Sequence, residues 1–149
     1  MTEPTRDLLF CAAALLDQGR HLDRLSRPLT AAALIGILVY PSMMGRPPWV
    51  LAGFSMLVAL AGVAETYYAI RVSFDAALFH QVASASGAPA FAGTDAALVR
   101  LGLLPATTIG RPAEARAHGA KRLFGFQILA LVAQVLSVLT GACVVLMWR

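Results

Sequence analysis

Charge is scarce in this chain and is missing altogether from one long stretch of it. Only 13% of the 149 residues are charged, and none of these lies within residues 123–148. A helix crosses the roughly 30 Å core of a bilayer with about 20 apolar residues, so this stretch is long enough to span it. The hydrophobic content of 58% and the mean hydropathy of +0.71 exceed those of soluble domains. The sequence therefore predicts an integral membrane protein.

Motifs for catalysis and metal binding are also missing. The chain contains no HExxH, GxSxG, Walker or GxGxxG sequence, each of which brings together the groups that a particular chemistry needs. His21, His80 and His118 do not share a helix face at metal-ligand spacing. Cys11 and Cys143 stand at opposite ends of the chain. We therefore predict no enzymatic activity, no cofactor and no metal site.

Lysine is the third rarity, because Lys121 is the only lysine among twelve basic residues. Together with abundant alanine, this preference for arginine is typical of GC-rich bacterial genomes. The net charge of +4 does not indicate nucleic-acid binding, because the basic residues flank apolar segments. There they orient membrane spans and contact anionic membrane lipid.

Three segments predict an all-α integral membrane protein with three transmembrane helices, at residues 29–44, 49–68 and 123–148. The first is the shortest and contains Pro41, so a re-entrant hairpin formed with the second is the alternative. Trp49 and Tyr68 bound the second span about 28 Å apart, as interfacial aromatics do. Its helical pattern continues to about residue 86, with Gly87 as a candidate C-cap. The third helix is expected to start near residue 112, so spans 2 and 3 both have cytoplasmic extensions.

Two further segments flank these spans. Residues 3–25 predict an amphipathic helix that lies on the inner membrane surface or packs on another helix there. Pro28, which follows this segment, is expected to break or restart the helix. Residues 87–111 form a loop rich in small residues, in which Thr94 and Asp95 are expected to cap a short helix at 95–101. The apolar side of the amphipathic helix is predicted to comprise Leu8, Cys11, Leu15, Leu22 and Leu25.

The distribution of basic residues predicts the orientation. Ten of the twelve fall in the N-terminal segment or between spans 2 and 3, and only Arg46 and Arg149 fall on the other side. The positive-inside rule then places the N-terminus in the cytoplasm and the C-terminus outside a bacterial inner membrane. The ten are Arg6, Arg20, Arg24, Arg27, Arg71, Arg100, Arg111, Arg116, Lys121 and Arg122.

Span 3 carries a stripe of small and polar residues that predicts a helix-packing seam. Its members fall within about 80° of one another on a helical wheel. An amide in hydrocarbon without a partner costs several kcal/mol, so the two glutamines are expected to face protein or water. A lining for an ion or solute path is the alternative. The stripe comprises Gln127, Ala130, Gln134, Ser137 and Gly141.

A second polar group is predicted at the inner boundary of span 2. Glu65 lies about one turn inside the boundary, and an acid at this depth is a candidate functional group. Tyr68, Arg71 and Asp75 follow at spacings of three and four, which places them on one helix face. We expect a structural polar cluster that contacts another helix; a proton- or cation-handling role for Glu65 is the alternative.

These features favour a non-catalytic accessory or scaffold subunit of a bacterial inner-membrane assembly. A three-helix protein has little interior in which to hide the seam, so we expect it to pair with other membrane subunits, identical or different. The first alternative is a small homo-oligomeric channel or holin-like pore, with Glu65 and the glutamines facing the lumen. The second is a membrane anchor for a redox partner that uses haem or quinone.

Overall fold

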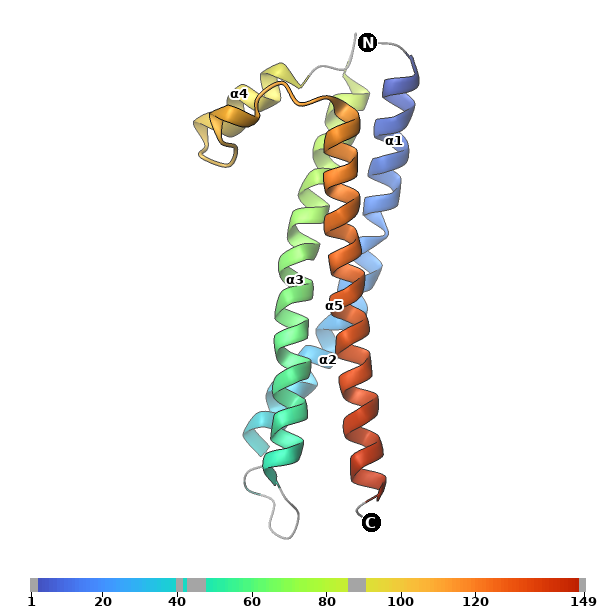
Figure 1. Cartoon of the computed structure of the whole chain (residues 1–149), viewed down its shortest axis with the longest axis vertical. Coiled ribbons are helices and arrows are strands. Elements are labelled where there is room, and N and C mark those ends of the chain that lie inside the picture. Colours follow the sequence, from blue (N-terminus) through green and yellow to red (C-terminus); the bar gives the residue numbers. More distant parts are fainter. Residues whose placement is uncertain (1–2, 40–41, 43–47, 86–90, 148–149) are drawn as a thin grey trace.

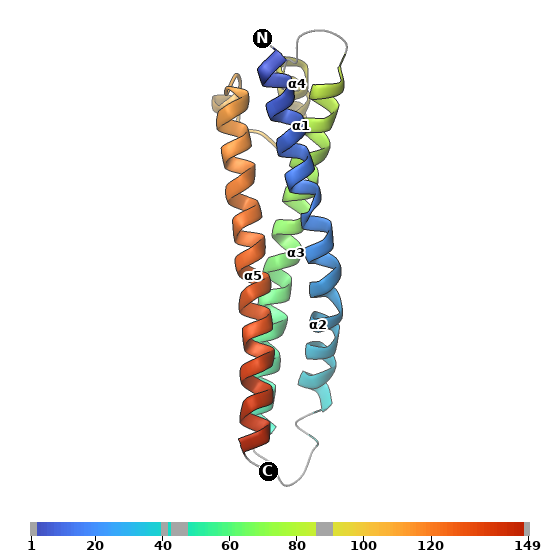
Figure 2. The ribbon, with the colours of Figure 1, turned by 90° about the vertical axis from the view of Figure 1, so that its right-hand side faces the viewer.

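The computed structural model describes residues 3–39, 42, 48–85 and 91–147, and all of the regular secondary structure within them is helical. The helices α3 (Pro48–Ser84) and α5 (Ala113–Met147) run antiparallel along the whole molecule (Figure 1). They contain 37 and 35 residues, so each is longer than 50 Å at about 1.5 Å per residue. The helices α1 (Glu3–Asp17) and α2 (Gly19–Val39) follow one another along this pair (Figure 2).

The N-terminal segment differs from the single amphipathic helix predicted over residues 3–25. The structure divides it at Gln18, where the amide of Gln18 donates to Leu15 O and that of His21 donates to Gln18 O. Both bonds span three residues instead of four, so the backbone tightens locally. Pro28 does not break α2 but lies inside it. Its missing N–H leaves the carbonyl of Arg24 without a helical partner, and Arg24 is exposed and accessible to solvent or lipid headgroups.

The buried face of this segment also differs from the predicted one. Leu15 and Leu25 are 42% and 61% exposed, whereas Leu9, Ala13 and Leu16 are buried. On α1 the buried leucines, Leu9 and Leu16, each lie one position after a predicted one. On α2 the buried residues are glycine, serine and alanine, which let this helix approach α3 and α5 closely. On α2 the prediction failed because it weighted the large leucines over these small residues.

Buried residues recur every seven positions on the three long helices. The buried residues of α5 are Ala113, Ala120, Gln127, Gln134 and Gly141. Residues spaced by seven stay on one face when antiparallel helices cross at a shallow angle, as in a left-handed coil. The matching series are Gly19, Ser26 and Ala33 on α2, and Val58, Glu65, Val72 and Phe79 on α3.

Packing changes along the rod. Around α1 the core is apolar, with Leu9, Leu16, Val72 and Phe79 among its members. Around α2 the buried side chains are largely polar or small, and large apolar side chains point outward. Those exposed residues include Leu34, Ile35, Leu38, Met56, Leu57, Leu60, Val63, Leu129, Val132, Leu136 and Leu139.

Two helices, Trp49–Ser84 and Ala113–Met147, are long and apolar enough to span a membrane. Only 22% and 11% of the residues in their most apolar stretches are buried within the chain. The helix α2 does not meet the same measure of length and hydropathy among the described residues. The predicted end of span 1 beyond Val39, and the Gly87 cap, lie outside the residues that the structure describes.

A short arm projects from the top of the rod (Figure 1). It contains α4 (Ala92–Arg100) and the 3-10 turn Ala106–Thr108. The helix begins at Ala92, three residues before the predicted start, and the position before it is Phe91, which provides no side-chain cap. The predicted capping role of Asp95 is wrong, because its carboxylate binds groups outside α4, as shown below.

Candidate functional site

The structure places the predicted seam of α5 partly inside the chain. Gln127, Gln134 and Gly141 are buried, while Ala130 and Ser137 are half-buried. The hydroxyl of Ser137 donates to the carbonyl of Ala133 on its own helix. The seam thus has an inner half filled by the chain's own helices and an outer half that is more accessible.

An inner polar layer joins three helices at the level where α1 gives way to α2. Nε2 of Gln127 donates to the carbonyl of Gly19 and to Oε1 of Glu65, both over 2.8 Å. Glu65 and Gln127 are 0% exposed. A Cβ on Gly19 would lie 2.7 Å from Oε1 of Gln127, so the absence of a side chain there gives Gln127 room to reach the backbone.

An outer polar layer lies two helical turns further along. The hydroxyl of Ser26 donates to Oε1 of Gln134 over 2.8 Å. Nε2 of Gln134 donates to Oγ1 of Thr30 over 2.9 Å and to the carbonyls of Ser26 and Val58 over 3.3 and 3.4 Å. Because buried polar groups must be paired in a low-dielectric interior, this layer specifies the register of all three helices.

Ser26 and Thr30 are the partners that sequence reasoning missed. Both come from α2, whose glycine, serine and alanine at positions 19, 26 and 33 repeat at the same interval as residues 127, 134 and 141 of α5. This shared seven-residue spacing of small and polar positions is the sequence signal that relates the two series. A search for hydrophobic faces could not find it, because these positions are not hydrophobic.

Two oxygens of the inner layer have no hydrogen-bond partner within the described residues, namely Oε2 of Glu65 and Oε1 of Gln127. Replacing Glu65 with glutamine puts an amide donor where a carboxyl oxygen now lies, so it can donate to Gln127. We expect Glu65→Gln to raise the unfolding free energy by about 1 kcal/mol. Thermal unfolding in detergent measures this. If Glu65→Gln and Glu65→Leu both lower the unfolding free energy by the same amount, the prediction is contradicted.

The predicted boundary cluster is divided in the structure. The ring of Tyr68 packs on Phe126, with centroids 5.5 Å apart, and the Arg71 guanidinium lies 5.3 Å from the centroid of Tyr67. Asp75 is half-buried and lines the same groove as Arg71. No hydrogen bond or ion pair among the described residues joins Glu65 to either of them. Glu65 is therefore an interior group, whereas Arg71 and Asp75 line a surface groove and Tyr68, which lies outside the lining of that groove, contacts Phe126.

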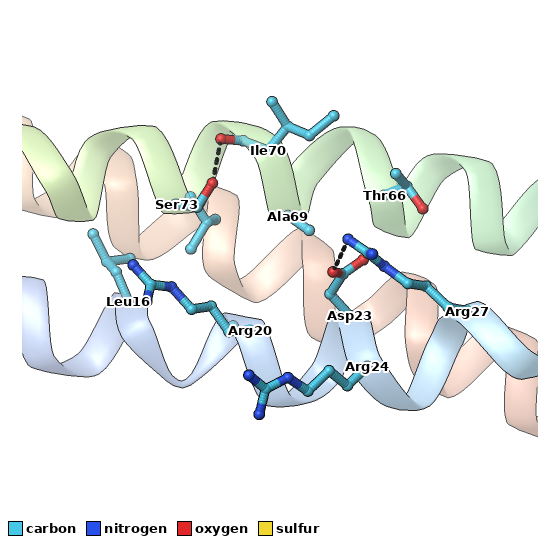
Figure 3. Close-up of a pocket in the computed structure, with 11 residues that line it drawn as sticks. Leu16, Arg20, Asp23, Arg24, Arg27, Thr66, Ala69, Ile70 and Ser73 are labelled. Carbon is cyan, nitrogen blue, oxygen red and sulfur yellow. Dashed lines mark hydrogen bonds and ion pairs between the residues drawn. The ribbon is translucent and has the colours of Figure 1, made fainter.

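A basic groove of about 390 Å³ runs between α2 and α3 (Figure 3). Arg20, Arg24 and Arg27 line its α2 side, and Asp23 lies among them, paired with Arg27. The hydrogen bond and the charge of Asp23 raise the pKa of Arg27, which keeps it a cation. Arg20 pairs with Asp17 on α1 over 3.3 Å. Two of the three cations of this groove are thus already neutralised by aspartates.

The arm is fixed to α5 by a buried ion pair. Oδ2 of Asp95 accepts hydrogen bonds from Nη2 of Arg116 over 2.8 Å and from the amide of Gly110 over 3.1 Å. Asp95 is 1% exposed. The Arg116 guanidinium also stacks 4.5 Å from the ring centroid of Phe91. Through Phe91 and Gly110, these contacts hold both ends of the arm on the part of α5 that was predicted as the cytoplasmic extension of span 3.

The three histidines lie apart and are exposed. Nε2 of His80 lies 3.0 Å from Oδ2 of Asp17, which links α3 to α1. Nδ1 of His118 lies 3.2 Å from the carbonyl of Glu114 on its own helix. Within the described part of the chain, no three histidine, cysteine or acidic side chains gather closely enough to hold a metal ion.

Comparisons with protein-family models, with curated proteins and with solved structures found no match for this chain.

Proposed function

We propose that this chain is a non-catalytic accessory or scaffold subunit of a bacterial inner-membrane assembly, with three membrane spans, a cytoplasmic N-terminus and an external C-terminus. Support for the placement comes from the exposed apolar side chains around α2 and the adjoining halves of α3 and α5. Further support comes from the ten-to-two distribution of basic residues. In this placement α2 forms the first span, and Arg27 reaches the headgroups from its inner end.

One observation carries the proposal of a partner. Ser137 and Gly141 of the seam line an open groove of about 280 Å³ between α2, α3 and α5, together with the small residues Ala32, Ser55 and Ala142 and with larger apolar residues such as Leu51 and Phe54. Small side chains let a further helix approach closely, and membrane helices associate largely through such packing. The groove therefore fits a transmembrane helix of another subunit. Gln127 and Gln134 are bonded to the chain's own α2 and α3, so this part of the seam offers no such surface.

Co-purification with membrane partners tests this proposal. Ala142→Leu fills the groove, and we expect it to reduce the yield of associated subunits about tenfold, since helix contacts are worth about 1–2 kcal/mol. Ala133→Leu is the matched control, because Ala133 is exposed on the same helix but lies outside the groove. Equal yields from both variants and the wild type would reject the groove as an interface. Gly141→Leu is unsuitable, since a Cβ there already lies 3.2 Å from Phe54.

The pore alternative loses its main support in this arrangement. It required Glu65 and the two glutamines to face a lumen between subunits. These three side chains are fully buried and bonded within a single chain. We therefore keep the accessory subunit as the proposal.

A further inference from the structure

A second basic groove, of about 580 Å³, lies beneath the arm, between α3 and α5. Its polar side is formed by Arg71, Arg111, Arg116 and Arg122, with Asp75 as its one acidic residue. Its apolar side includes Leu78, Phe79, Leu103, Leu104, Leu123 and Phe126. The groove thus combines guanidinium groups with a large apolar wall.

The arginines of this groove are less neutralised than those of the groove in Figure 3. Arg116 is paired with Asp95, but Arg71, Arg111 and Arg122 form no ion pair within the described residues. Arg71 and Arg122 instead lie over the rings of Tyr67 and Phe126, at 5.3 and 5.4 Å from the centroids. Stacking on a ring orients a guanidinium but leaves its N–H donors available. These donors can therefore receive an anion.

Arg71 and Arg122 also lie at matching depths. Tyr68 and Phe126 are in contact across the two helices. Arg71 lies about one turn beyond Tyr68 on α3, and Arg122 lies about one turn beyond Phe126 on α5, both toward the arm. On α5, Arg122 is the last charged residue before the uncharged stretch 123–148. In the proposed membrane placement, both guanidinium groups lie at the headgroup level of the inner leaflet. Leu123 and Phe126 then lie one step deeper, at the level of acyl chains.

We propose that this groove binds the phosphate headgroup of an anionic phospholipid from the inner leaflet, with Arg71 and Arg122 as its ligands. Guanidinium groups pair with phosphate oxygens through two parallel hydrogen bonds. Basic pockets between transmembrane helices on the cytoplasmic side suit such headgroups. The arm closes the groove from the cytoplasmic side through Leu103 and Leu104. This inference rests on the membrane placement proposed above.

Native mass spectrometry of the full chain in detergent tests the site, using added phosphatidylglycerol and phosphatidylcholine as the probes. We expect the wild type to retain phosphatidylglycerol preferentially. Arg71→Gln/Arg122→Gln should weaken retention about 25-fold, because each arginine lost should weaken it about fivefold. The matched control Arg20→Gln/Arg24→Gln removes the same charge from the other groove and should change retention by about fivefold or less.

Asp75→Asn separates binding from folding. Removing the one acidic residue of the groove should strengthen retention of phosphatidylglycerol, which damage to the fold would not do. Equal losses in the two double variants, or equal retention of both lipids, would overturn the proposal. Displacement of the lipid by inorganic phosphate at equal concentration would do the same, because it would indicate a site for soluble phosphate.

The membrane placement has its own readout in the same experiment. Alkaline carbonate extraction of host membranes shows whether the chain is integral. A chain found in the soluble fraction would reject the proposed function itself. An integral chain with no preference for phosphatidylglycerol would reject only the lipid site.

Discussion

Gly62→Ala is expected to destabilise the fold by about 2–4 kcal/mol, through overpacking and a lost buried hydrogen bond. Gly62 is buried on α3, where α2 and α5 both approach. A Cβ at this position would overlap Oγ1 of Thr30 and would lie 2.8 Å from Nε2 of Gln134. Thr30 can relieve the overlap only by turning its hydroxyl away from Gln134, which breaks the outer polar layer. Thermal unfolding in detergent measures the effect.

Gly53 provides the control for this experiment. It lies on the same helix, and a Cβ there would meet nothing within 4 Å. Alanine lowers the backbone entropy cost of a helix, so Gly53→Ala should raise the unfolding free energy by about 0.5–1 kcal/mol. If both variants shift stability in the same direction, the close approach of α2 and α3 at Gly62 is wrong.

Asp95→Ala is expected to release the arm at a cost of about 3–5 kcal/mol, because Arg116 would keep a largely buried charge without a partner. Side-chain exposures of 1% for Asp95 and 14% for Arg116 place this pair away from solvent. Amide exchange in the arm reports the change. Loss of this much free energy from the contact between the arm and α5 should speed amide exchange in the arm by at least about a hundredfold, while exchange in the middle of α5 should stay slow.

Two controls test the assignment of this effect to a buried charge. Asp17→Ala removes a carboxylate whose ion pairs are more exposed, and should cost about 0–1 kcal/mol. Asp95→Ala/Arg116→Ala removes both charges and should release the arm less than Asp95→Ala does. A double variant that is worse than the single one would show that the pair contributes in another way.

The sequence predicted the helical class and the two long apolar helices, since charge depletion is a strong signal over such lengths. It also identified Gln127 and Gln134 as groups that must face a partner. It could not say which partner, because amides bond equally well to the same chain or to another. Only the three-dimensional register brings Gly19 and Ser26 opposite these amides.

The error on α2 has a physical cause. Its buried face depends on how closely the helices approach, and small residues such as Gly19 and Ser26 decide that distance. Hydrophobic periodicity is insensitive to alanine, glycine and serine, so it favoured Leu25 instead. The role of Asp95 was missed for a different reason: its partner Arg116 is 21 residues away on a different helix.

In the proposed membrane placement, the change in packing along the rod sets the depth at which the molecule lies in the bilayer. Apolar packing holds helices together in water, whereas in lipid it gives no advantage over contact with acyl chains, and buried amides take over. In α5 the interior changes from Ala120 to Gln127 within two turns, at the level where α1 ends and α2 begins. Sliding the rod along the bilayer normal would put the leucine core in lipid or the amide layers in water. The change from an apolar to a polar interior, at Gly19, Glu65 and Gln127, thus fixes the position of the rod along the bilayer normal in that placement.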